Sequence, residues 1–221
     1  HTIELAAVAI GVTAITNQQY MAFIESGGYS DPACWSQAGW RWRESRHAEE
    51  PGFVDDMRLN HPLQPVVGVC WYEADACARW LARSTGQPWR LPTEAEWEAA
   101  ARGTDAFTLP DVALVNSAER GLGRTWAALG RGAESWCGAK DMLGNVWEWC
   151  STRWGHNWQT LDYPYPYDAD DGREDLSGSH ARIMRGGSWY DPLREAHPTS
   201  RGRYLPGSRG SNIGFRLARS V

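Results

Sequence analysis

Apolar residues recur at helical spacing three times in the first half of the chain. Thr16 and Gln19 form a capping box in front of the first of these stretches. A second capping box, from Thr93 to Glu96, precedes the third stretch. A glycine follows each stretch, which is typical of a helix C-terminus. We therefore predict three helices. The first follows Thr16 and ends at Gly27–Gly28, and the second covers residues 71–84 and stops at Gly86. The third follows Thr93 and ends at Gly103.

The pattern changes in the second half, where glycine, proline and aromatic residues interrupt the chain every few positions. The apolar runs are short there, and Ile183–Met184 and residues 213–217 are interpreted as short strands. Residues 154–176, with their alternating tyrosines and prolines, are predicted to form a long ordered surface loop. No linker divides the chain, which predicts one loop-rich α+β domain over residues 1–221. Because the chain begins at His1, we expect it to be the C-terminal part of a longer protein.

The composition indicates how such a domain is packed. The 221 residues include 14 tryptophans beside 23 glycines and 12 prolines. Large rings can fill the core of an irregular fold, and each buried indole N–H then needs an acceptor. The net charge is −5 with both signs interspersed, which argues against a nucleic-acid partner. No apolar run is long enough to span a membrane, and the visible start has no signal-peptide pattern.

The five cysteines are an odd number and include no closely spaced pair. We interpret them as buried free thiols in a reducing compartment, and the cytoplasm is favoured. Their spacing does not resemble that of zinc ligands. The positions are Cys34, Cys70, Cys77, Cys137 and Cys150.

A run of acid and base groups lies near the C-terminus, at Asp191, Arg194, Glu195 and His197. Closeness in sequence does not supply the geometry of a nucleophile, a base and an orienting group, so we do not assign catalysis to them. His61 and His156 are interpreted as structural residues of loops.

Four segments together resemble a known family. They are Arg90–Glu98 (RLPTEAEWE), Asp141–Trp149 (DMLGNVWEW), Arg185–Trp189 (RGGSW) and Asn212–Arg216 (NIGFR). In this order and spacing they are similar to the formylglycine-generating enzymes, also called sulfatase-modifying factors. The similarity spans nearly the whole chain and implies a C-type-lectin-like α+β fold with few regular elements.

The same resemblance bears on activity. In the family a pair of cysteines that holds copper follows the Gly-Gly-Ser motif, whereas here residues 189–200, and the residues from there to Val221, contain no cysteine. Thiolates are not readily replaced by oxygen or imidazole groups, so we expect neither formylglycine formation nor copper. Related domains occur in iron-dependent sulfoxide synthases, whose metal histidines lie on a separate helical domain that is not seen here.

Residues 189–216 also resemble the variable regions of proteins that bacterial retroelements diversify. The fixed frame corresponds to Arg201, Arg203, Pro206, Arg209 and Asn212–Arg216. The exchangeable ligand-binding positions correspond to Tyr190, Asp191, Gly202, Tyr204, Leu205, Gly207, Ser208, Gly210 and Ser211. Residues of these types make adaptable contacts. The frame arginines are expected to bond loop carbonyls or carboxylates. Trp189, Ile213 and Phe215 are expected to lie in the core.

This interpretation predicts a non-catalytic domain that binds a protein or a small molecule through a mutable face. Two alternatives stay open. The first is a protein-interaction or sensor domain that is not diversified, and the second is a surviving enzyme of the same fold.

Finally, the resemblance implies a structural calcium. Carried over by position, its ligands are the side chains of Asp141 and Glu148 and the carbonyls of Gly144 and Val146. A second calcium site of the family starts at the positions of Asn116 and Ser117, but residues 120–124 lack the carboxylate that is needed. We therefore expect at most one calcium. Alternatively, Asp141 and Glu148 cap turns or pair with arginines.

Overall fold

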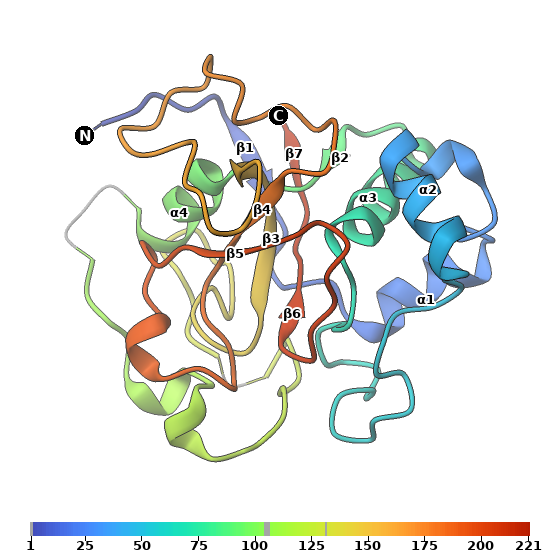
Figure 1. Cartoon of the computed structure of the whole chain (residues 1–221). Helices are drawn as coiled ribbons and strands as arrows, with labels where there is room; N and C mark the ends of the chain where they lie inside the picture. Colours follow the sequence, from blue (N-terminus) through green and yellow to red (C-terminus); the bar gives the residue numbers. More distant parts are fainter. Residues whose placement is uncertain (1, 104–106, 131) are drawn as a thin grey trace.

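The computed structural model describes residues 2–103, 107–130 and 132–221 of the chain (Figure 1). Three of the α-helices lie together on one side of the sheets, and the fourth lies on the other side. The α-helices are α1 (Asn17–Glu25), α2 (Gln37–Arg46), α3 (Trp71–Thr85) and α4 (Glu94–Arg102). Short 3₁₀ helices cover Pro32–Cys34, Val112–Leu114, Ala118–Arg120 and Leu193–Glu195.

The three predicted helices are confirmed as α1, α3 and α4. Both capping boxes form, since the Thr16 and Thr93 hydroxyls accept the backbone N–H groups of Gln19 and Glu96. Helix α2 was not predicted. Its start is an ordinary cap at Ser36, but its residues have no clear apolar face, because tryptophans alternate with arginines around it.

The ends of the chain meet in a three-stranded antiparallel sheet. Strand β7 (Ala218–Ser220) lies between β1 (Val8–Ile10) and β2 (Trp89–Arg90). Ala9 and Trp89 both pair with Arg219 from opposite sides. The sheet therefore fixes the C-terminal strand to the start of the domain.

A second sheet of four strands carries the loop-rich half, in the order β5-β4-β3-β6. Its strands are β3 (Trp147–Gly155), β4 (Ala181–Arg185), β5 (Gly202–Tyr204) and β6 (Ile213–Gly214). Strands β4 and β3 are antiparallel, and β6 joins β3 in parallel.

The expected strands are confirmed in part. Residues 183–184 lie within β4, but the strand predicted at 213–217 is wrong beyond Gly214. After Gly214 the chain leaves β3, and the carbonyls of Phe215 and Leu217 accept the N–H groups of Ile15 and Gly11 instead. The expected surface loop begins later than predicted, because Trp154 and Gly155 end β3, and residues 156–180 contain no helix or strand.

Tryptophans fill the core as the composition predicted. The rings of Trp71, Trp97 and Trp149 are fully buried. Each indole N–H has an acceptor: the Cys150 carbonyl at 2.9 Å, the Glu148 carboxylate at 2.7 Å and the Val69 carbonyl at 3.0 Å, respectively. These rings link α3, α4 and β3 in one packed unit.

Buried ion pairs connect the last third of the chain to this core. The Arg216 guanidinium donates to both oxygens of Glu148, at 2.6 and 2.8 Å, and neither side chain reaches solvent. Arg185 donates to Glu94 at 2.8 Å in an equally buried pair. Removing one partner of such a pair leaves the other charge uncompensated inside the protein.

We predict that Arg216→Leu lowers the free energy of unfolding by about 3–5 kcal/mol, because Glu148 then lies buried without its partner. Urea unfolding followed by circular dichroism measures the change. Arg83→Leu is the matched control, because its pair with Asp31 is exposed and is worth at most about 1 kcal/mol. Equal losses of unfolding free energy in the two variants would contradict the claim that the buried pair contributes more stability than the exposed one.

Candidate functional site

The segment that follows β4 leaves the sheet through the Gly-Gly turn. Gly186 and Gly187 have φ values of 104° and 73°, which side chains rarely adopt. A β-carbon on Gly187 would lie 2.9 Å from the Ala196 backbone nitrogen. The glycines of this motif thus allow both the turn and the close return of the chain.

Frame residues fix the segment 201–209 to the two buried helices. Arg201 donates twice to Glu94 of α4, at 2.9 Å each. Arg209 donates to Glu73 of α3, and the buried Pro206 accepts the Trp71 N–H at 3.0 Å. Arg203 donates to the Trp158 carbonyl at 3.1 Å. Carboxylates and loop carbonyls therefore hold all three frame arginines, as predicted.

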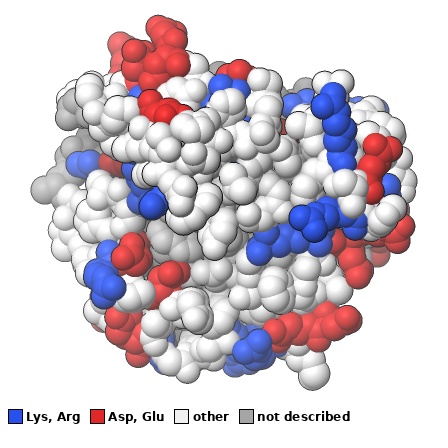
Figure 2. Space-filling model, viewed as in Figure 1, with Lys and Arg blue, Asp and Glu red and all other residues white. Residues whose placement is uncertain are grey.

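Between these anchors, the candidate ligand-binding positions reach the surface. Tyr190, Tyr204 and Leu205 are the most exposed, at 69%, 52% and 42%. The other six are half-buried: Asp191, Gly202, Gly207, Ser208, Gly210 and Ser211. The chain between β5 and β6 crosses the middle of the view in Figure 1; on the same face in Figure 2, the centre is largely uncharged and a band of Lys and Arg lies just to its right.

Several of the nine positions also support the fold. Asp191 accepts the Trp147 indole N–H at 2.8 Å and is hydrogen-bonded to the Ser188 hydroxyl. A β-carbon on Gly207 would lie 2.7 Å from the Trp42 ring, and one on Gly210 would lie 2.9 Å from Ile213. Larger side chains at these two glycines therefore require the neighbours to move.

Trp189 differs from the prediction that it belongs to the core. Its ring is only half-buried, and its N–H donates to the Ser211 carbonyl at 3.3 Å. It also contacts the exposed Tyr190 ring edge-on. Ile213 and Phe215 are buried, as predicted. Trp189 thus lies beside two of the candidate positions, Tyr190 and Ser211.

The acid and base groups near the C-terminus have separate partners. Asp191 faces Trp147 and Ser188, whereas the His197 ring contacts Thr199 and Phe107. The structure does not join them into a relay. His156 is exposed and contacts Asp162 at 2.7 Å, so it belongs to its own loop.

Four of the five cysteines are buried, and the exposed Cys137 is an exception to the prediction. Burial raises the pKa values of all four buried thiols, which opposes formation of a reactive thiolate; they are Cys34, Cys70, Cys77 and Cys150. All five are unpaired. None of the buried thiols thus has the environment of a nucleophile.

The two carboxylates among the predicted calcium ligands differ in how far other groups already bind them. Burial, and to a smaller extent the nearby Glu148 charge, raise the pKa of Asp141 to about 7. The Asp141 Oδ1 accepts the Trp126 N–H at 3.0 Å, and its buried Oδ2 has no hydrogen-bond partner among the residues described. Glu148, by contrast, is already bound by Arg216 and Trp97. Asp141 therefore fits a cation, whereas Glu148 fits one only by sharing its charge with Arg216.

The backbone part of the set lies in the tight turn between these two carboxylates. Gly144 has a φ of 74°, and its carbonyl accepts the Val146 N–H at 2.8 Å. The start of the second family site is occupied by contacts within the protein, since Asn116 donates to the Arg124 carbonyl and Ser117 donates to Glu119.

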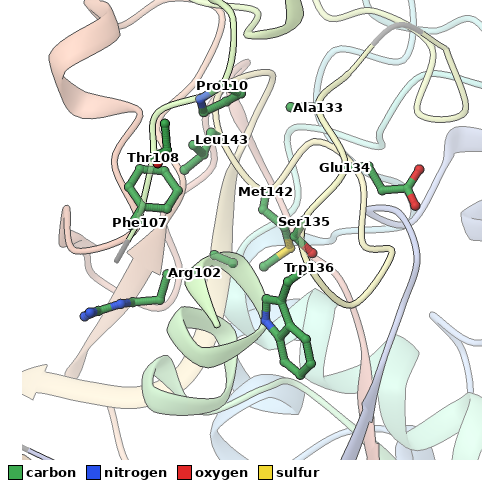
Figure 3. Close-up of a pocket in the computed structure, with 11 residues that line it drawn as sticks. Arg102, Phe107, Thr108, Pro110, Ala133, Glu134, Ser135, Trp136, Met142 and Leu143 are labelled. Atoms are coloured by element: carbon green, nitrogen blue, oxygen red, sulfur yellow. The ribbon is translucent and has the colours of Figure 1, made fainter. Parts of the chain in front are cut away.

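A cavity of about 240 Å³ lies beside the C-terminal end of α4 (Figure 3). Its wall is mixed: the apolar side chains of Phe107, Leu143 and Trp136 lie beside polar ones, among them Thr108 and Ser135. Its two charged residues are paired elsewhere, Arg102 with Glu98 and Glu134 with Lys140. The cavity offers shape but no group poised for chemistry.

Within the described residues, no helix combines the length and the apolar character needed to cross a bilayer.

Comparisons with known proteins place this geometry in a family. The model of the sulfatase-modifying factor enzyme 1-like domain matches residues 1–221. Hercynine oxygenase of Mycolicibacterium thermoresistibile is 32% identical and covers 100% of this chain. The formylglycine-generating enzyme of Streptomyces coelicolor is 30% identical over 99% of this chain and 80% of its own length. The chain spans only 52% of that hercynine oxygenase, and 34% of a Chlamydia pneumoniae protein kinase that is 31% identical.

Among solved structures, variable protein 1 of Treponema denticola has the same fold. Its TM-score is 0.70 at 24% identity, and the match covers 100% of this chain and 87% of that one. The expected C-type-lectin-like fold is confirmed. Since the family model spans the whole chain, this protein belongs to the sulfatase-modifying factor enzyme 1-like family, the family of the formylglycine-generating enzymes.

Proposed function

We propose that this domain is a non-catalytic binding module, whose segment 189–216 presents a mutable surface of the kind that retroelements diversify. The observation that carries the proposal is the separation of roles along this segment. The frame arginines and Pro206 are tied to α3, α4 and a neighbouring loop, whereas Tyr190, Tyr204 and Leu205 project into solvent. Side chains on such a support can change without loss of the fold.

The contacts of the segment rank its nine candidate positions. Tyr190, Tyr204, Leu205, Ser208 and Ser211 carry side chains at exposed or half-buried positions. Asp191 and the three glycines contact the framework more closely. We therefore propose that the five side chains form the main contact surface. The occupant is a protein or a small molecule, and tyrosine at two of the positions favours contact through rings.

We predict that a library randomised at Tyr190, Tyr204, Leu205, Ser208 and Ser211 retains folding. Single changes at Tyr204 or Leu205 should alter the free energy of unfolding by no more than about 0.5 kcal/mol, as is usual at surface sites. Display on yeast, with thermal challenge followed by selection against a panel of proteins, measures folding and binding together.

The control library randomises the frame residues Arg201, Pro206 and Arg209, and it should lose folded display. Equal tolerance in both libraries, or no binders from the first, would remove support for the mutable face. Sequencing the DNA that flanks the gene supplies independent evidence. The proposal expects a reverse-transcriptase gene and a near-copy of the 3′ segment that differs at adenines.

The runner-up function is oxidation of a cysteine by an enzyme of the formylglycine-generating type, which the relatives favour. Against it, no cysteine follows Cys150, and burial raises the pKa of four of the thiols. A reactive thiol needs a lowered pKa and access to solvent.

We therefore predict that incubation with copper, reductant, oxygen and a sulfatase-motif peptide leaves the mass of the peptide unchanged. Mass spectrometry of the peptide is the measurement, and the Streptomyces coelicolor enzyme serves as the positive control. Conversion of the peptide cysteine to an aldehyde would restore the enzyme interpretation.

We also propose that one structural calcium is held by Asp141, the Gly144 and Val146 carbonyls, and Glu148. The unpartnered buried oxygen of Asp141 supports a cation there, because an unsatisfied carboxylate oxygen is costly inside a protein.

A ligand that binds only the folded state raises its stability, by about 2.7 kcal/mol at a hundredfold excess over Kd. We thus predict that the melting temperature falls with EDTA and rises when calcium is added, as scanning fluorimetry measures. Asp141→Asn should remove the response, and magnesium in place of calcium tests selectivity. Melting that is indifferent to EDTA and to calcium means that the site does not exist.

A further inference from the structure

A cavity of about 490 Å³ lies between the turn at residues 57–64 and the turn at residues 120–127. Both turns are on the lower side of the view in Figure 1. This volume is within the range of pockets that hold small molecules. It belongs neither to the proposed binding face nor to the proposed calcium ligands. Its wall consists of Met57, His61, Gln64, Arg120, Leu122, Arg124, Thr125, Trp126 and Ala127.

The walls of this cavity are held in place from both sides. Gln64 donates to the Arg58 carbonyl at 2.8 Å and to the Thr125 carbonyl at 2.7 Å, and so links the two turns. The Trp126 ring is fixed through its N–H to Asp141. The Arg120 guanidinium lies 5.5 Å from the centre of the Trp126 ring. The site is therefore built before any ligand arrives.

The charged groups of the wall are two arginines, of which Arg120 also donates to the Ala113 carbonyl. Neither Arg120 nor Arg124 forms a salt bridge with any of the residues described, and no residue of the wall is acidic. The His61 Nδ1 accepts the Leu63 N–H at 3.3 Å, which leaves the proton on Nε2.

Thr125 provides an independent observation. The residue is 1% exposed, and its hydroxyl has no hydrogen-bond partner among the described residues. A buried hydroxyl without a partner costs free energy unless a ligand or water satisfies it. Thr125 lines the cavity, and its hydroxyl is available to donate to or accept from a ligand there.

We propose that this cavity binds a small organic anion, namely a carboxylate carried on a planar ring. The arginines match a carboxylate in charge and in their paired N–H groups. The indole of Trp126, with Leu122 and Met57, provides the apolar wall for the ring. A cation of the same shape is disfavoured, because the wall contains two arginines and no acidic residue.

Benzoate is the probe, and benzamidine, which has the same ring with a cationic group, is its control. Isothermal titration should show that benzoate binds the wild-type domain, that its affinity falls as salt is raised, and that benzamidine does not bind. Arg124→Gln should weaken benzoate binding about tenfold or more, since it removes a charge-assisted contact. Thr125→Val, which keeps the shape but removes the hydroxyl, should weaken it by a smaller factor.

Arg194→Gln is the matched control, because that arginine is 78% exposed and does not line the cavity. Melting temperatures of all variants confirm that each is folded. The proposal is overturned if benzoate does not bind at millimolar concentration, if benzamidine binds equally well, or if Arg124→Gln and Arg194→Gln have the same affinity as the wild type. Because the cavity is separate from the segment 189–216, these outcomes are independent of the display experiment.

Discussion

Buried arginine–carboxylate pairs hold the loop-rich half of this domain on its helical half. Arg185 and Arg201 share Glu94 at the first residue of α4, while Arg209 binds Glu73 in the first turn of α3. The partners are far apart in sequence, for example 107 residues for Arg201 and Glu94. Planar, two-pronged contacts of this kind fix orientation as well as position. Short strands alone would not fix these loops as firmly.

The position of the carboxylates explains why they tolerate burial. Glu94 and Glu73 lie at helix N-termini, where the helix dipole favours a negative charge. The capping box at α3 uses the same Glu73 side chain, which accepts the Cys70 N–H at 2.8 Å. The Glu73 side chain thus caps the start of α3 and also holds a distant loop through Arg209. A change at either position is therefore expected to disturb the segment 201–209, because it removes the carboxylate that holds Arg201 or Arg209.

Features that depend on interactions between residues close in sequence could be predicted, whereas those that depend on distant contacts could not. Helices α1, α3 and α4 were predictable, because caps and glycine stops act within a few residues. Helix α2 and strand β3 were not, since one has no clear apolar face and the other is buried along almost its whole length and so does not alternate.

The site shows the same division. The frame arginines were expected to find carboxylates or carbonyls, but no local pattern identifies Glu94 or Glu73 as their partners. Nor could spacing reveal that Gly207 lies against Trp42, or that Thr125 and Arg124 line a cavity with His61. These contacts depend on how distant loops pack.

Glu148 shows how one side chain can limit the uses of this fold. Its oxygens receive two bonds from Arg216 and one from Trp97, while Arg216 also donates to the carbonyls of Gly11 and Lys140. A cation at Glu148 has to compete with a guanidinium that is itself held by the first strand segment. If the Arg216–Glu148 pair is weakened, the bonds by which Arg216 joins Gly11 to Lys140 are therefore weakened too. Glu148 shares its negative charge with Arg216, so it attracts a calcium ion less strongly than a free carboxylate. Calcium therefore stabilises the domain only if Asp141 and the carbonyls of Gly144 and Val146 supply the rest of the attraction.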